Sequence, residues 1–220
     1  MLELKGLDVS IGTVQVLRSV SLEMPDGAMA GLVGRNGAGK TTLMRSIMGL
    51  LPVAAGTVRF DGSDLLALPS FRRAAQGIGY MPEDRRLIPE LAVEENILLP
   101  AWANGVGDAA ARLQRIYRLI PELTHFATRK AMQLSGGQQK LVALGRALMC
   151  GTRLLLLDEP FEGVAPALAQ RLVEVVGALQ SEGLSVIFSE SDFQHSARLV
   201  DRVFSIDRGV LTEGVHRPHH

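Results

Sequence analysis

The sequence predicts an α/β fold in which helices lie on both faces of a mostly parallel sheet. A short apolar run at residues 29–33 leads into a glycine-rich loop, and a helical pattern follows at residues 42–50. Four consecutive leucines at residues 154–157 are typical of a parallel strand that is covered on both faces. Further apolar runs alternate with helical stripes along the chain, as in sheets whose strands are joined by helices.

Composition limits the classes of protein and partner that need to be considered. The chain has 220 residues, which is long enough for one large domain with a sizeable core. Lys and Arg number 23 and Asp and Glu also number 23, so the net charge is zero and no nucleic-acid partner is expected. Cys150 is the single cysteine, which fits a reducing compartment. No apolar run approaches the roughly 18 residues that span a bilayer, so we expect a soluble chain that reaches a membrane only through a partner.

The N-terminal part is expected to be an antiparallel β subdomain. Residues 2–9 and 14–23 alternate apolar and polar side chains on either side of Ile11 and Gly12, which predicts two strands joined by a turn. A third short strand is predicted at residues 57–60, because the turn dipeptide Asp61-Gly62 follows it.

The middle of the chain is expected to form a helical subdomain at about residues 84–135, within a single domain that spans residues 1–220. A strand is predicted at residues 78–81, and helical spacing follows in the four apolar residues Leu113, Ile116, Tyr117 and Ile120. The last predicted elements are a helix at about residues 168–179 and strands at residues 184–188 and 203–206.

The glycine-rich loop fits the pattern G-x-x-x-x-G-K-[ST], and we call it the phosphate loop. Its residues are Gly34, Arg35, Asn36, Gly37, Ala38, Gly39, Lys40 and Thr41, and Thr42 follows it. Its three glycines permit backbone conformations in which successive N–H groups point at a polyphosphate. Lys40 is expected to reach the β- and γ-phosphates, and the Thr41 hydroxyl is expected to bind Mg²⁺. The loop therefore predicts a nucleotide site.

Two acidic residues follow the run of leucines. Asp158 and Glu159 are expected at the C-terminal end of that strand, where the phosphate loop also opens. Asp158 would then hold Mg²⁺, and Glu159 would polarise the attacking water as a general base. The combination with the phosphate loop predicts nucleotide hydrolysis.

A third motif, which we call the signature motif, is Leu134-Ser135-Gly136-Gly137-Gln138. A serine and two glycines at a helix start make a second anion cradle. With the other two motifs in this order, the chain resembles the nucleotide-binding subunits of ATP-binding cassette (ABC) transporters, whose signature is Leu-Ser-Gly-Gly-Gln. The resemblance implies the ABC type of phosphate-loop fold, ATP and Mg²⁺ as ligands, and ATP hydrolysis. It also implies a head-to-tail dimer in which each ATP lies between one subunit's phosphate loop and the other's signature motif.

Finer details resemble the ATPase subunits of branched-chain amino acid importers, to which urea and amide importers are closely related. These details are residues 77–86, residues 89–96 and the stretch from Glu162 to Pro166. They favour the shorter of the two ATPase subunits that such systems pair. The resemblance implies ATP-driven uptake of a small polar solute at the cytoplasmic face of the inner membrane. The implied partners are transmembrane permease subunits, a second ATPase subunit that is related or identical, and indirectly a solute-binding protein.

Three positions depart from the family pattern. Ile11 stands where many members stack an aromatic ring on adenine, so the base should be held less tightly. Glu83 stands where most members have a glutamine near Mg²⁺ and the attacking water; we interpret it as a trait of the importer branch, with a surface carboxylate as the alternative. Ser191 stands at the position of the switch histidine and has no ionisable nitrogen. His195, four residues later, is expected on a helix surface.

The expected residues fall into three groups. Those that bind the nucleotide are Ile11, Gly34, Arg35, Asn36, Gly37, Ala38, Gly39, Lys40, Thr41, Thr42, Ser135, Gly136, Gly137 and Gln138. The catalytic residues are Lys40, Glu83, Glu159 and Ser191, and the metal ligands are Thr41, Glu83 and Asp158.

Two functions remain open at this point. The chain is either an active ATPase that powers import, as Lys40, Asp158 and Glu159 indicate, or a half that binds ATP and mainly completes its partner's site, as Ile11 and Ser191 indicate. A cassette ATPase that acts on DNA or ribosomes is disfavoured, because the chain is neutral and carries one cassette.

Overall fold

The computed structural model describes residues 1–192 and 197–214, and their strands form two sheets. The smaller sheet is antiparallel, with strand order β2-β1-β4-β5. Its strands are β1 (Leu2–Ile11), β2 (Val14–Met24), β4 (Ala55–Phe60) and β5 (Ser63–Asp64). The predicted N-terminal antiparallel strands are therefore present, each slightly longer than the sequence pattern indicated.

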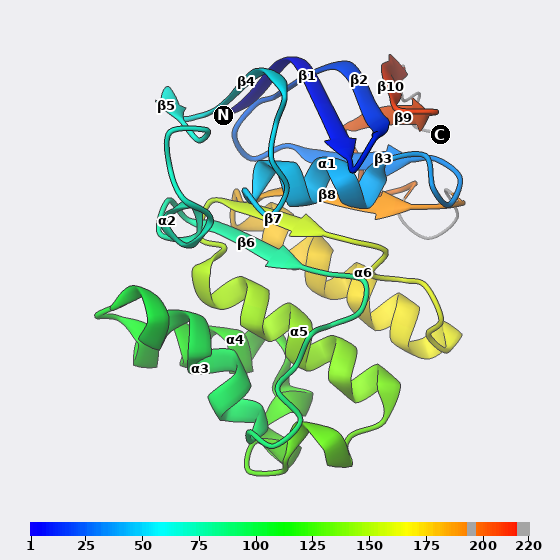
Figure 1. Cartoon of the computed structure of the whole chain (residues 1–220). Coiled ribbons are helices and arrows are strands. Elements are labelled where there is room, and N and C mark those ends of the chain that lie inside the picture. Colours follow the sequence, from blue (N-terminus) through cyan, green and yellow to red (C-terminus); the bar gives the residue numbers. More distant parts are fainter. Residues whose placement is uncertain (193–196, 215–220) are drawn as a thin grey trace.

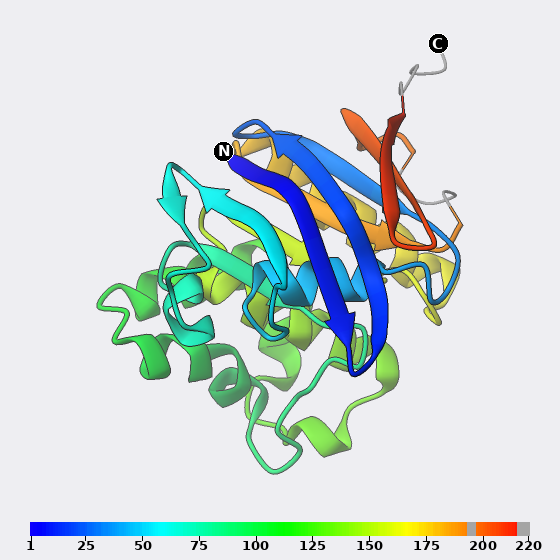
Figure 2. The ribbon, with the colours of Figure 1, turned by 45° about the horizontal axis from the view of Figure 1, so that its top comes forward.

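The larger sheet has the strand order β10-β9-β3-β8-β7-β6 and is parallel except for its last pair, β9 and β10. Its strands are β3 (Met29–Val33), β6 (Ile78–Met81), β7 (Leu154–Leu157), β8 (Ser185–Glu190), β9 (Arg202–Asp207) and β10 (Val210–Gly214). This arrangement confirms the predicted mostly parallel sheet. Strand β10 was not predicted, because its residues are largely exposed and carry no alternating pattern. It lies beside β2 at the edge of the molecule (Figure 2).

Helices cover both faces of the parallel sheet, as the sequence predicted (Figure 1). Helix α1 lies between the two sheets, α5 and α6 lie on the opposite face, and α3 and α4 pack beyond α5. The helices are α1 (Lys40–Ile47), α2 (Ser70–Ala74), α3 (Val93–Asn104), α4 (Ala109–Leu119), α5 (Gly136–Cys150) and α6 (Pro166–Ser181), with short 3-10 helices η1 (Pro121–Phe126) and η2 (Ala131–Gln133). The division into a core and a helical subdomain at residues 84–135 stays a prediction.

The four leucines of β7 separate two hydrophobic cores. Leu154 and Leu156 belong to the core shared with α1 and the antiparallel sheet. Leu155 and Leu157 belong to the core shared with α5 and α6. Because successive side chains of a strand point to opposite faces, a strand between two cores is apolar at every position. In the described ranges, no helix combines the length and hydropathy needed to cross a membrane.

Strand β6 approaches α5 so closely that there is no room for a side chain between them. A Cβ atom added to Gly79 would lie 2.1 Å from the carbonyl oxygen of Ala147 and 2.9 Å from the Cα of Gly151. Both contacts involve main-chain atoms, which cannot move out of the way by changing rotamer. The spacing between the parallel sheet and α5 therefore depends on glycine at position 79.

We expect Gly79→Ala to lower the free energy of unfolding by about 1–3 kcal/mol or more, because the methyl group would force β6 and α5 apart. Chemical denaturation of the isolated chain measures this change. Gly107→Ala is the matched control: no atom lies within 4 Å of the added methyl group, so its effect should stay within about 0.5 kcal/mol. Equal stability of the two variants would contradict the packing argument.

Candidate functional site

The candidate site lies where the parallel strands end. Strand β3 continues into Gly34, β7 into Asp158, β8 into Ser191, and β6 reaches Glu83 after one intervening residue. The strands are in parallel register, so these ends meet at one edge of the sheet. The carboxyl ends of parallel strands are the usual place for a ligand in such sheets.

The phosphate loop has the backbone that a polyphosphate cradle requires. Gly37 and Gly39 have φ angles of 81° and 119°, a region that residues with a Cβ rarely adopt. The turn between β9 and β10 holds the loop, since the Gly209 N–H donates to the Ala38 carbonyl oxygen at 3.0 Å. Helix α1 then begins at Lys40, and its N-terminus favours an anion.

A cavity of about 340 Å³ opens over this loop. Its wall is formed by phosphate-loop residues and two carboxylates, namely Asn36, Gly37, Gly39, Lys40, Thr41, Thr42, Glu83 and Glu159. Glycine main chain, an ammonium and a helix N-terminus fit a polyphosphate. The Thr41 hydroxyl and nearby carboxylate oxygens are the ligand types that Mg²⁺ prefers, so the residues present also fit that ion.

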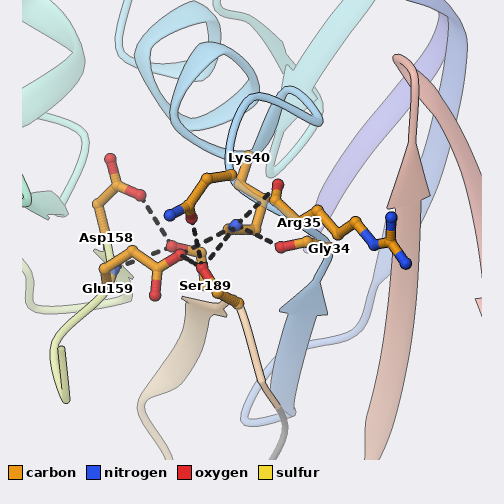
Figure 3. Close-up of polar contacts among 8 residues, drawn as sticks. Gly34, Arg35, Lys40, Asp158, Glu159 and Ser189 are labelled. Atoms are coloured by element: carbon orange, nitrogen blue, oxygen red, sulfur yellow. Dashed lines mark hydrogen bonds and ion pairs between the residues drawn. The ribbon is translucent and has the colours of Figure 1, made fainter.

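Lys40 is buried and bound on several sides (Figure 3). Its ammonium donates hydrogen bonds to the carbonyl oxygens of Gly34 at 2.5 Å and Arg35 at 3.3 Å, and to Ser191 Oγ at 3.3 Å. It also forms an ion pair with Glu159 Oε1 at 3.0 Å, and both side chains are less than a tenth exposed. In this structure the Glu159 carboxylate is therefore the anion that pairs with Lys40.

Glu159 is held in a strained conformation. Its φ angle is 48°, which costs a residue with a Cβ about 1–2 kcal/mol. Its N–H donates to Ser189 Oγ at 2.9 Å. Ser191 Oγ lies 2.8 Å from Glu159 Oε1 and 2.7 Å from Asn36 Oδ1, and its single proton serves one of these acceptors at a time. Ser191 thus contacts both Lys40 and Glu159.

Asp158 is fully buried beside Glu159. Its Oδ1 accepts a hydrogen bond from Ser189 Oγ at 2.8 Å, and its Oδ2 accepts one from the Tyr80 hydroxyl at 3.4 Å. Burial raises the pKa of this carboxyl, while hydrogen bonds from Ser189 and Thr41 lower it. Contact between Thr41 and Asp158 brings two predicted metal ligands together.

The sequence motifs did not predict the roles of Ser189 and Tyr80. Ser189 is buried, accepts from the Glu159 N–H and donates to Asp158, so it fixes both acidic residues. One signal was available, namely a polar residue directly after the apolar run at residues 186–188. For Tyr80 the partner lies across a strand pair, which no local motif encodes.

Glu83 lines the same cavity, and its side chain is largely exposed. Partial loss of solvent at the cavity wall is the largest cause of a raised pKa for this carboxyl, followed by the negative charges of Asp158, Glu162 and Glu159. Three other carboxylates thus act on Glu83 at this edge of the sheet. A bound cation would offset the repulsion that Glu83 experiences.

The signature motif and Ile11 lie away from this cavity. Ser135 caps α5: its Oγ accepts from the Gln138 N–H at 3.3 Å, and Gln138 Oε1 accepts from the Ser135 N–H at 3.0 Å. None of residues 134–138 lines the cavity at Lys40. Ile11 is 48% exposed at the end of β1. His195, expected on a helix surface, lies outside the described residues.

Comparison with known proteins agrees with this geometry. The ABC transporter family matches residues 17–162. The high-affinity branched-chain amino acid transport ATP-binding protein BraG of Pseudomonas aeruginosa is 35% identical over 96% of this chain and 91% of that protein. The lipoprotein-releasing system ATP-binding protein LolD of a Ruegeria species is 41% identical over 92% of this chain and 91% of that protein. A solved dimeric ATP-binding cassette in a post-hydrolysis state with ADP and Pi is 25% identical, with a TM-score of 0.86 and full coverage of both chains.

We expect Glu159→Gln to tighten binding of a non-hydrolysable ATP analogue by about tenfold, equivalent to about 1.4 kcal/mol. The reason is that the carboxylate competes with phosphate for the Lys40 ammonium, and an uncharged amide competes less. Calorimetric titration of the isolated chain measures the affinity. Glu90→Gln, which removes an exposed carboxylate elsewhere, should leave it unchanged. Unchanged or weaker binding by Glu159→Gln would contradict the competition.

Proposed function

This chain belongs to the ABC transporter family and is an ATP hydrolase, and we propose that it powers an importer of a small polar solute. The solute class that we propose is branched-chain amino acids or a related amino acid, urea or amide. In this proposal the chain lies at the cytoplasmic face of the inner membrane, bound to transmembrane permease subunits. A solute-binding protein would deliver the solute to those subunits.

The observation that carries the ATPase role is the meeting of Lys40, Asp158 and Glu159 at one edge of the parallel sheet. The solute class is supported by the similarity to BraG and by residues 77–86, 89–96 and 162–166. LolD is 41% identical to this chain, against 35% for BraG, and its name places it in a lipoprotein-releasing system, so the cassette motifs alone do not determine the solute.

The proposed mechanism follows from the contacts within the site. Lys40 exchanges its ion pair with Glu159 for the β- and γ-phosphates when ATP enters. Thr41 and Asp158, with Glu83 nearby, would hold Mg²⁺, which neutralises charge on the phosphates. Glu159, once released, accepts the proton of the attacking water, and Ser191 donates a hydrogen bond that orients the Glu159 carboxylate.

We also propose that a second ATPase subunit, related or identical, completes the site. Residues 135–138 lie outside the chain's own cavity, at the N-terminus of α5, where a cap and a helix end are suited to an anion. In a head-to-tail pair they would contact the ATP that the partner holds. Ile11 would make an apolar contact with the adenine of this chain's own ATP.

A surface for the permease subunits is available on α2, α3 and the segment that precedes α3. Helices α2 and α3 are in contact, and each exposes a large aromatic side chain: Phe71 is 65% exposed and Trp102 is 56% exposed. Ile88 is 37% exposed, whereas Leu87 packs against the core. Exposed apolar groups of this size are typical of surfaces that bind another protein.

The first test uses the assembled transporter in proteoliposomes, with uptake of labelled leucine and ATP turnover measured together. Glu159→Gln in this chain alone should lower both rates by more than about tenfold, because the general base is lost. The same substitution in the partner subunit serves as the comparison. ATP turnover without uptake of leucine, urea or amides would contradict the solute class.

A different outcome of that test would favour the second function. If only the partner's substitution lowers turnover, this chain chiefly binds ATP and completes the other site. Ser191, which replaces an ionisable histidine, is the observation that supports this alternative.

We expect Ser191→His to raise ATP turnover by about threefold or more, because an imidazole reaches farther than a hydroxyl and adds a donor for the γ-phosphate. Steady-state turnover of the assembled transporter measures the effect. Ser181→His, at an exposed position on α6, should change nothing and controls for the added side chain. Unaltered turnover in Ser191→His would mean that serine does not limit hydrolysis at this site.

A further inference from the structure

Lys140 is a buried cation that the mechanism above does not use. It lies on α5, five residues after Ser135, and its side chain is 6% exposed. Its ammonium donates to three main-chain carbonyl oxygens: Glu159 at 2.9 Å, Pro160 at 3.1 Å and Glu162 at 2.5 Å. An ammonium has three protons, so these bonds use its full capacity.

Burial of this charge is unfavourable by itself. Burial lowers the pKa of Lys140, as does the positive charge of Arg85, while Glu162, Glu159 and Glu83 act in the opposite direction. Neutral carbonyl oxygens compensate a buried ammonium less well than a carboxylate in direct contact. The unfavourable burial of Lys140 therefore indicates that its hydrogen bonds have a specific role in the segment that it binds.

The bound segment, residues 159–162, is the turn that follows β7, and we call it the acidic turn. Glu159 begins it with a φ angle of 48°, a conformation that the surrounding structure has to maintain. The Glu159 N–H is fixed by Ser189 Oγ at 2.9 Å, and the Glu159 carbonyl is fixed by Lys140. The main chain of Glu159 is thus held on both sides, which sets the direction of its side chain toward Lys40.

We propose that Lys140 is a positioning residue for ATP hydrolysis. It fixes the acidic turn so that the Glu159 carboxylate faces the phosphate site, and it does so from the helix that begins with the signature motif. Lys140 itself does not contact ATP in this proposal. The inference rests on the proposed role of Glu159 as the general base.

The first experiment compares three variants in the assembled transporter. Lys140→Met keeps the apolar stem and removes the donors, so kcat should fall by about tenfold or more while KM for ATP stays within about twofold. Lys140→Gln keeps an amide that can donate to two of the carbonyls, so its loss of kcat should be smaller. Lys130→Met removes an exposed lysine and is the matched control, with wild-type rates expected.

A double-mutant cycle distinguishes positioning from a merely structural role. Single-turnover hydrolysis is measured for Lys140→Met in the wild-type and Glu159→Gln backgrounds. If Lys140 acts through Glu159, its substitution has no further effect once Glu159 is replaced. An equal fold-decrease in both backgrounds would overturn the proposal. Should Lys140→Met fail to assemble, Lys140→Gln completes the same cycle with a smaller expected effect.

The outcomes also separate this inference from the proposed function. If Glu159→Gln lowers hydrolysis by more than about tenfold while the Lys140 variants keep the wild-type kcat, Glu159 is the base and the positioning role of Lys140 is refuted. If Glu159→Gln leaves this chain's turnover unchanged, the role of Glu159 fails and that of Lys140 fails with it.

Discussion

Parallel pairing of β3, β8, β7 and β6 is the constraint on which the site depends. It brings the ends of four strands to one edge, so that Lys40 and Ser191, separated by 151 positions in the chain, lie in contact. Register matters as much as order, because a shift of one residue would turn every side chain to the other face of the sheet. The two cores on either side of β7 prevent such a shift, since each needs alternate leucines of that strand.

Helix α5 organises the loops around this edge with two buried or partly buried cations. Lys140 holds the acidic turn, and Arg146 donates to the carbonyl oxygens of Arg85 and Arg86, two residues with positive φ. Arg85 in turn donates to the Gly136 carbonyl at the start of the same helix. Two main-chain segments that contain positive φ angles are thus bound to one helix.

The sequence predicted the parts of the site that local motifs encode. The phosphate loop and the Asp158-Glu159 pair are contiguous, and their chemistry follows from residue type and spacing. The contributions of Ser189, Tyr80 and Lys140 arise only when distant segments pack together, so no short pattern marked them. The same holds for the fold: buried strands were predicted from their apolar runs, whereas the exposed strand β10 and the short helix α2 have weak patterns and were missed.

The close contact between Gly79 and Ala147 has a mechanical consequence. The main chain of Gly79 meets the main chain of Ala147 and Gly151 there, and main-chain atoms cannot absorb a relative movement by changing rotamer. We therefore expect strand β6 and helix α5 to move together. Helix α5 begins at the signature motif and β6 ends two residues before Glu83, so this contact joins the two elements that carry these groups.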